Sequence, residues 1–445
     1  MAYDFAHQID DALGGDLPAD VTVTETSAGE LPSCFLVSDL AVAAFRAAAG
    51  ELAALEGALN VTIDRRLALM WFGMTLRPSG WELPSAWDPI AGDYRAADGW
   101  IRLHTNAPRH REAAMSVLDC RPERVAVAEA VIGWRKAALE DAIVAAGGAA
   151  AAMHSLSAWA AHPQGRAVAA EPLIAWEATG QGRASIALRG LRVLDLTRVL
   201  AGPVATRFLA GFGADVLRVD PPLWSEPGVE PEVTLGKRRA GLDLCKAEDR
   251  RTFEDLLSHA DVLVHGYRPG ALEGLGYGRE QRLRIAPNLI EVSLDAYGWT
   301  GPWSGRRGFD SLVQMSCGIA EEGMARSGSD RPVPLPVQAL DHGTGYLMAA
   351  AVLRAVRRRR MTGGSFSARL SLARTAAMLT AAGARDFRGA APEETEADLA
   401  PEIEATGWGP ARRLTFPVRI DGAGPQWPSP AGVLRIDPPR WRASP

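Results

Sequence analysis

Short runs of apolar residues alternate with longer, helix-like stretches through the second half of the chain. The apolar runs lie at residues 191–194, 216–219, 261–264 and 289–293. Strands that alternate with helices at this spacing are typical of a parallel sheet with helices on both faces. The pattern therefore predicts an α/β protein whose large domain contains a doubly wound parallel sheet.

The first half of the chain has a different pattern, in which a long helix comes early. Residues 36–58 are rich in alanine and leucine, and Ser38 or Asp39 stands where a capping side chain would lie. A short strand is expected to follow at residues 60–63. Residues 1–30, which are polar and rich in Asp, Thr and Gly, are expected to be loosely held.

A smaller α+β lobe is expected after this helix and strand. Residues 77–89 are rich in Pro, Trp and Ser and predict a loop. Residues 92–106 predict a hairpin with its turn at Ala97-Asp98-Gly99. Two or three amphipathic helices are expected to occupy about residues 109–164.

Length and composition narrow the class of protein. At 445 residues the chain is long enough for two domains, or for one large domain with an inserted lobe. Its net charge of −5 argues against general nucleic-acid binding, which needs a basic surface. The four cysteines are far apart, so neither a disulfide framework nor a zinc site is expected. Without a signal peptide or an apolar stretch that could span a bilayer, the expected location is the cytoplasm, with no membrane partner.

A series of motifs runs through residues 188–379. In chain order they are VLDLTRVLAGP (193–203), GADVLRVDPP (213–222), GKRRAGLDL (236–244), ADVLVHGYRPGALEGLG (260–276), PNLIEVSLDAYGWTGPW (287–303), GFD (308–310) and ALDHGTGYLMAAAVL (339–353). This segment resembles the family III CoA-transferases (the CaiB/BaiF type), which include carnitine–CoA transferases, formyl-CoA transferase and α-methylacyl-CoA racemase. The resemblance implies the family's fold, a doubly wound parallel-sheet large domain plus a smaller α+β lobe.

The order of the motifs is reversed relative to that family. The family's second lobe is matched by GDYRAADGWIRL (92–103) and AWAAHPQGRAV (158–168), which here lie upstream of the large domain. Residues 37–49 also align without gaps to residues 339–351, which places Asp39 opposite Asp341. The chain therefore resembles two trimmed copies fused head to tail, or a natural permutation.

The expected parts of the chain follow from this comparison. They are a lead-in at 1–30, a degenerate segment like the tail of a large domain at 31–75, a small lobe at 76–175, a CoA-binding large domain at 188–380 and a C-terminal tether at 381–445.

Asp341 is the candidate catalytic residue. A carboxylate at the start of an alanine-rich helix is stabilised by free N–H groups and the helix dipole, and it can attack a thioester. The resemblance implies that this acid is the family's nucleophile, which forms a mixed anhydride and then an aspartyl-CoA thioester. The alternative is an Asp that only caps its helix.

The resemblance also implies contacts to coenzyme A, which enters as the acyl-CoA substrate. No permanently bound cofactor and no metal are expected, and the second substrate would be a small carboxylic acid. The candidate CoA-binding residues, chosen by charge or aromatic character and by motif position, are Arg198, Arg218, Lys237, Arg238, Tyr267 and Arg268. Because the family's subunits form interlocked dimers, a homodimer is expected.

Two other functions remain open from the sequence. The first is a racemase-like isomerase, which Phe309 disfavours because it stands where the racemases carry a histidine base. The second is an inactive relative that keeps only the fold. It is favoured by Gly274, which stands where transferases often have an arginine, and by the lack of a glycine-rich loop before the hairpin.

Overall fold

The large domain is built on a seven-stranded sheet. The computed structural model describes residues 4–181 and 187–442, so the first three residues of the expected lead-in and the last three of the expected tether lie outside it. In spatial order the strands are β11 (Arg238–Gly241), β10 (Asp215–Asp220), β9 (Arg192–Leu196), β12 (Val262–His265), β13 (Ile290–Asp295), β14 (Gly364–Ser371) and β8 (Ala175–Gln181). All neighbouring pairs are parallel except β14 with β8. The predicted doubly wound parallel sheet is confirmed.

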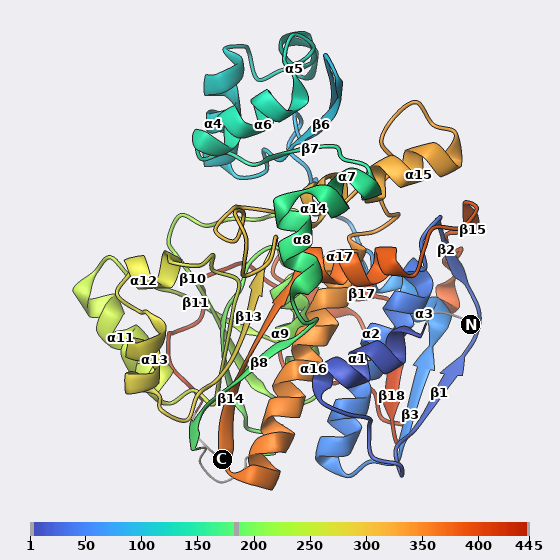
Figure 1. Cartoon of the computed structure of the whole chain (residues 1–445). Coiled ribbons are helices and arrows are strands. Elements are labelled where there is room, and N and C mark those ends of the chain that lie inside the picture. The colour runs from blue at the N-terminus through green and yellow to red at the C-terminus, as the bar shows by residue number, and fades with distance from the viewer. Residues whose placement is uncertain (1–3, 182–186, 443–445) are drawn as a thin grey trace.

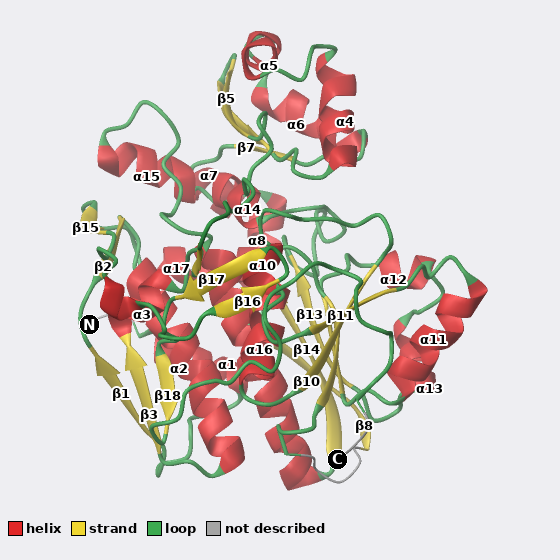
Figure 2. Ribbon diagram, turned by 180° about the vertical axis from the view of Figure 1, so that it is seen from behind, coloured by secondary structure: helices red, strands yellow, loops and turns green. Residues whose placement is uncertain are grey.

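Helices cover both faces of this sheet (Figures 1 and 2). Alternate residues of β9 point to opposite faces, so that Val193 belongs to one apolar cluster and Leu194 to the other. The Val193 side is covered by α9 (Ala201–Gly211), α16 (Ala339–Thr362) and α17 (Leu372–Ala381). The Leu194 side is covered by α11 (Ala247–Ser258), with α12 (Ala271–Gly274) and α13 (Arg279–Ile285) beside it.

The N-terminal segment packs against the large domain (Figure 1). It consists of α1 (Phe5–Leu13), β1 (Thr22–Thr26), β2 (Glu30–Ser33), α2 (Val37–Glu56), β3 (Asn60–Asp64) and α3 (Arg65–Met70). The expectation of a loosely held lead-in is wrong for the described residues, because Phe5, Ile9 and Leu13 of α1 are buried against the core. Neither Ser38 nor Asp39 caps α2, since Ser38 Oγ accepts from the Leu31 N–H and Asp39 pairs with Arg65.

The expected repeat has a structural counterpart. Helix α2 lies directly against α16, and each helix is followed by a strand and then a shorter helix, β3 and α3 in one case and β14 and α17 in the other. Aromatic contact between Phe45 of α2 and Tyr346 of α16, with ring centroids 4.0 Å apart, joins the two helices in the core.

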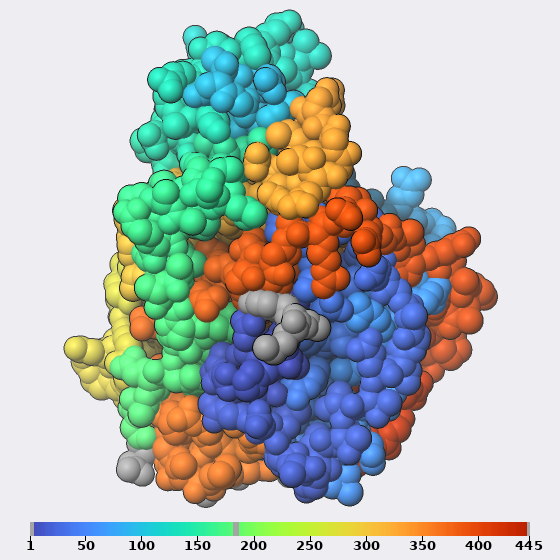
Figure 3. Space-filling model, turned by 45° about the vertical axis from the view of Figure 1, so that its right-hand side comes forward, coloured from blue at the N-terminus to red at the C-terminus, as the bar shows by residue number. Residues whose placement is uncertain are grey.

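The small lobe projects from one end of the molecule (Figure 3). The hairpin of β5 (Gly92–Ala96) and β6 (Gly99–Leu103) is extended by β7 (Ala150–Ala152), and helices α4 (Pro108–Leu118), α5 (Arg124–Val131) and α6 (Lys136–Ala145) share an apolar core with it. The chain returns through α7 (Leu156–Ala161) and α8 (Pro163–Ala170). Four helices, α4 to α7, therefore lie in the range where two or three were expected. Strand β8 then joins the large sheet rather than the lobe.

The C-terminal segment ties the parts together. It carries β15 (Arg388–Ala390), β16 (Glu404–Thr406), β17 (Gly409–Arg413) and β18 (Val418–Ile420), which pair with β2, β17, β4 (Leu76–Pro78) and β3 respectively. The remaining helices, α10 (Glu230–Val233), α14 (Asp310–Ser316) and α15 (Ile319–Ser327), lie in connections of the large domain. Of the helices in residues 4–181 and 187–442, none combines the length and apolar character that a bilayer crossing requires.

Candidate active site

A cavity of about 280 Å³ lies at the point where the sheet's strand order reverses. From β9 the chain winds outward to β10 and β11, then returns to place β12 on the other side of β9. Such a switch point at the carboxyl ends of parallel strands is where α/β sheets bind ligands. The loops after β9, β12 and β13 line the cavity, together with the start of α9, Asp341 of α16 and two residues of α4.

Asp341 lies in the first turn of α16 and is only 7% exposed. Its backbone N–H donates to Oδ2 of Asp310 over 2.9 Å. Burial and the nearby Asp310 carboxyl hold the pKa of Asp341 well above its usual range. The N-terminus of α9, at Ala201 and Gly202, lies in the same cavity wall, so two helix N-termini favour an anion there.

Asp310 is the acid of the GFD motif and is buried at the start of α14. Burial raises the pKa of Asp310 to about 6, although hydrogen bonds from the Asp341 and Leu340 N–H groups and from Gln314 oppose that shift. Gln314 in turn accepts from the Leu335 N–H over 2.7 Å. This chain of contacts fixes the segment that leads into Asp341.

Glycine in the ALDHGTG motif allows close packing of helices. A Cβ at Gly345 would lie 2.4 Å from the Ala201 carbonyl oxygen, so only glycine lets α16 approach α9 this closely. His342, the residue after Asp341, stacks on Phe72 at 5.1 Å between ring centroids and does not line the cavity.

The turn after β9 has a strained backbone, and a hydrogen bond to Glu226 stabilises it. Val199 has a φ of 65°, which a β-branched residue rarely adopts, and its N–H donates to Oε2 of Glu226 over 2.8 Å. Arg218 is fully buried and pairs with both Asp220 and Glu226. Arg218, expected to contact CoA, therefore fixes the carboxylate that holds this turn.

Arg198, Tyr267 and Arg268, three of the candidate CoA-binding residues, line the cavity. A guanidinium nitrogen of Arg198 donates to the Tyr267 hydroxyl over 2.7 Å, and the Arg198 guanidinium carbon lies 4.7 Å from the Trp224 ring centroid. Arg268 donates to the Gly305 carbonyl over 2.9 Å. Tyr267 and Arg268 also line a second cavity, which adjoins the first.

Three further arginines line the first cavity and were missed from the sequence; one of them, Arg306, pairs with Glu140. Arg109 comes from the first turn of α4 in the small lobe, and Arg307 precedes the GFD motif. Burial and the neighbouring guanidiniums lower the pKa of Arg109 and of Arg307. Across the described parts of the chain, no carboxylate forms an ion pair with any of Arg109, Arg198, Arg268 and Arg307. The pocket is therefore strongly cationic and suited to phosphate groups.

A histidine also lines the cavity from the small lobe. His110 follows Arg109 in α4, is 1% exposed and packs edge-on against Phe309, and neither ring nitrogen has a partner. Burial, aided by nearby arginines, lowers the pKa of His110 to about 4, so the ring is neutral at neutral pH. His110 lies in the first turn of α4, and no pattern in the sequence linked it to Asp341.

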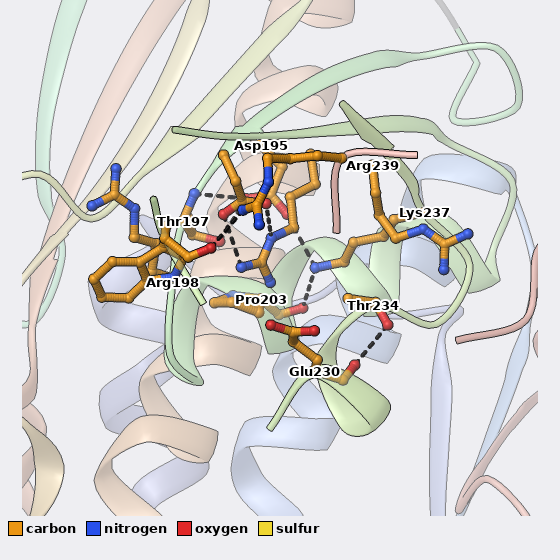
Figure 4. A network of polar contacts seen from close by, with 12 residues as sticks. Asp195, Thr197, Arg198, Pro203, Glu230, Thr234, Lys237 and Arg239 are labelled. Carbon is orange, nitrogen blue, oxygen red and sulfur yellow. Dashed lines mark hydrogen bonds and ion pairs between the residues drawn. The ribbon is translucent and has the colours of Figure 1, made fainter. Parts of the chain in front are cut away.

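Lys237 and Arg238 were expected to bind CoA, but neither residue lines the cavity. Lys237 is fully buried, and its Nζ lies 3.0 Å from Oδ2 of Asp195 and 3.0 Å from the Pro203 carbonyl (Figure 4). Burial lowers the pKa of Lys237 to about 8, and the Asp195 carboxylate opposes that shift. Arg238 pairs with Asp215 at 3.0 Å. Both cations are thus neutralised inside the protein.

No metal centre is evident around the cavity or elsewhere in residues 4–181 and 187–442, because three or more His, Cys, Asp or Glu side chains do not gather at one point there.

Comparison with known proteins finds a family that the large domain resembles. Residues 188–405 match the family model described as CoA-transferase family III. The chain is similar to Acetyl-coenzyme A transferase nodX of Hypoxylon pulicicidum, with 36% identity over 190 residues, 42% of this chain and 32% of that protein. It is also similar to Succinyl-CoA:glutarate CoA-transferase of Mus musculus, with 34% identity over 189 residues, 40% of this chain and 43% of that protein. The chain thus spans less than half the length of these relatives.

Among solved structures, a hypothetical protein (Rv3272) from Mycobacterium tuberculosis is similar at 31% identity, covering 45% of this chain and 57% of that one with a TM-score of 0.39.

Proposed function

We propose that the chain moves CoA between an acyl-CoA thioester and a carboxylic acid, because residues 188–405 match the family model of CoA-transferase family III. Asp341 is the nucleophile of this proposal. The observation that carries it is a buried carboxyl at the N-terminus of α16, in a cavity lined by four arginines that lack carboxylate partners. A helix N-terminus and a cationic wall both favour the anions that such a reaction forms.

The proposed steps conserve atoms and charge. The Asp341 carboxylate attacks the thioester carbonyl, the C–S bond breaks, and CoA leaves as a thiolate from a mixed anhydride. The thiolate then attacks the Asp341 carbonyl carbon and releases the first carboxylic acid as its carboxylate. The second carboxylate repeats these steps in reverse and leaves as the new thioester.

The arginines of the pocket support the CoA part of the proposal. Arg109, Arg198, Arg268 and Arg307 are free to meet phosphate oxygens, whereas Arg218, Lys237 and Arg238 already have carboxylate partners. We therefore assign CoA binding to the first group, with Tyr267 beside it. The adjoining second cavity, which shares Tyr267 and Arg268, offers room for the rest of an elongated ligand.

The experiment is an exchange assay that monitors the protein as well as the products. Purified protein is incubated with acetyl-, succinyl- and formyl-CoA, each with a set of small carboxylic acids, and the new thioesters are quantified. Intact-mass and peptide mapping should find a CoA adduct on Asp341 that hydroxylamine removes. A protein that binds CoA but forms neither adduct nor product would be an inactive relative.

An isomerase is the second candidate, and His110 is the observation that favours it. Its neutral imidazole lines the same cavity as Asp341, so the absence of a histidine at Phe309 does not remove a second base. Deuterium exchange at Cα of a 2-methylacyl-CoA, without transfer to a carboxylic acid, would support this function instead.

The expected homodimer and the expected cytoplasmic location remain part of this proposal. Light scattering on the purified chain tests the first of them.

A further inference from the structure

Asp295 is a second carboxyl in the wall of the same cavity, and the proposed transfer steps do not use it. It is the last residue of β13, it lines the cavity with Asp341, and it is only 4% exposed. The two residues line the cavity from different elements, Asp341 from the start of α16 and Asp295 from the end of a central strand.

The two oxygens of Asp295 have unequal surroundings. Oδ1 accepts from the Tyr297 N–H over 2.7 Å and from the Gly298 N–H over 2.8 Å. Oδ2 is buried and has no hydrogen-bond partner in the part of the chain that the structure describes. The loop thus fixes the orientation of the carboxyl and leaves one oxygen without a partner, which costs free energy unless a ligand supplies one.

The charges around Asp295 do not neutralise it. Burial raises the pKa of Asp295 to about 8, the two N–H donors oppose the shift, Glu171 adds to it and Arg268 opposes it weakly. The carboxylate of Glu171 is itself engaged with the Trp299 and Thr300 N–H groups. At neutral pH the Asp295 carboxyl is therefore mostly neutral, and the proton lies on the oxygen that has no donor facing it.

We propose that Asp295 is a catalytic hydrogen-bond donor, whose Oδ2–H binds the acyl oxygen of the substrate as that oxygen becomes negative in the tetrahedral intermediate. This inference rests on the proposed CoA transfer. No proton changes hands, because the acyl oxygen gains charge when Asp341 attacks and loses it when the C–S bond breaks. A neutral, buried carboxylic acid is a known kind of oxyanion donor.

The test compares Asp295→Asn with Asp295→Ala in the full chain, using rapid-quench formation of the Asp341 adduct from acyl-CoA. Asparagine keeps an oxygen for the two loop N–H groups and presents its amide N–H where Oδ2 lies. We expect Asp295→Ala to slow adduct formation by about a hundredfold or more, with a small change in KM, and Asp295→Asn to lose less than about tenfold.

A pH profile adds a readout that a purely structural role would not change. Adduct formation by the wild type should fall as pH rises through about 8, as Asp295 ionises, and Asp295→Asn should keep its rate above that pH. If Asp295→Ala fails to fold, the comparison of the alkaline limb between the wild type and Asp295→Asn still tests the proposal. Asp39→Asn, in the first turn of the related helix α2, is the control for loss of an acid outside the cavity.

The outcomes separate the two proposals. A wild type that forms no adduct overturns the transfer mechanism and this inference with it. If the wild type reacts and Asp295→Ala stays within about threefold, or Asp295→Asn is as slow as Asp295→Ala, only the role of Asp295 is overturned.

Discussion

The backbone N–H of Asp341 donates to the side chain of Asp310 over 2.9 Å. The acid of the GFD motif therefore positions the backbone of the acid in the ALDHGTG motif. The two carboxyls are close enough for Asp310 to raise the pKa of Asp341. Asp310 thereby holds the start of the helix and, together with burial, raises the pKa of Asp341.

Replacing Asp341 by alanine should abolish CoA transfer and leave the fold intact. Without a carboxylate there is no covalent intermediate, and turnover should fall by about a thousandfold or more. The matched control is Asp39→Asn, because Asp39 pairs with Arg65 at 2.7 Å on a half-exposed surface. That variant should keep activity within about threefold and lose at most about 1 kcal/mol of stability. Retention of a tenth of wild-type turnover by Asp341→Ala would exclude the mechanism.

Asp310→Asn should shift the acid limb of the pH profile to lower pH. Asp341 attacks as a carboxylate, so its raised pKa makes activity increase as pH rises through that value. Removal of the neighbouring acid charge lowers the pKa of Asp341, and a larger fraction is then ionised at a given pH. The measurement is kcat against pH for both proteins. An unchanged or upward-shifted limb would show that Asp310 does not set the ionisation of Asp341.

Arg109→Ala should raise the KM for acyl-CoA by about tenfold with little change in kcat, because a phosphate contact is made equally in the ground and transition states. The wild-type KM should also rise with salt, and less so in the variant. Arg238→Ala is the control, since Arg238 pairs with Asp215 away from the cavity. Equal effects of the two substitutions would contradict the assignment of the pocket arginines.

Glu232→Gln should destabilise the protein by about 3–5 kcal/mol, because it leaves buried cations without their partner. Glu232 is fully buried, pairs with Arg207 and Arg413, and accepts from Thr75. Burial raises the pKa of Glu232, but the two arginines outweigh it and lower the pKa to about 2.

The lowered pKa of Glu232 makes the stability of the protein depend on pH in the acid range. The folded pKa of Glu232 lies below the ordinary value of 4.5, so its contribution is complete above that pH and is lost as pH falls towards about 2. Denaturant titrations between these values should find a steeper loss of stability in the wild type than in Glu232→Gln. Parallel curves would contradict this.

A fragment that begins at residue 188 should neither fold well nor transfer CoA. In this fragment β14 loses its partner β8, and the C-terminal strands β17 and β18 lose their partners β4 and β3. The cavity also loses Arg109 and His110. The expected result is poor solubility alone and recovery of activity when the N-terminal part is co-expressed. Full activity of the isolated fragment would show that the upstream lobe does not contribute to the site.

The sequence predicts the sheet well, but not the pattern of charges around the cavity that Asp341 lines. Strand positions follow from apolar runs that are buried on both faces, and these runs need no knowledge of distant contacts. Lys237 could not be placed in the same way, because its partner Asp195 belongs to another strand and only the folded sheet brings them together. Arg109 and His110 were missed for a similar reason, because their lobe lies far upstream of Asp341 in the sequence and only the folded protein brings it to the cavity.

The pairing of β18 with β3 governs how the chain can fold as it is synthesised. Asn60 is made early, yet its N–H bonds to Asp421, 361 residues later. The first sheet therefore waits with an open edge until almost the whole chain has left the ribosome. Closing so long a loop is slow, and the exposed strand β3 is meanwhile open to pairing with other chains. We therefore expect slow, concentration-sensitive refolding, because strands from distant parts of the polypeptide share one sheet.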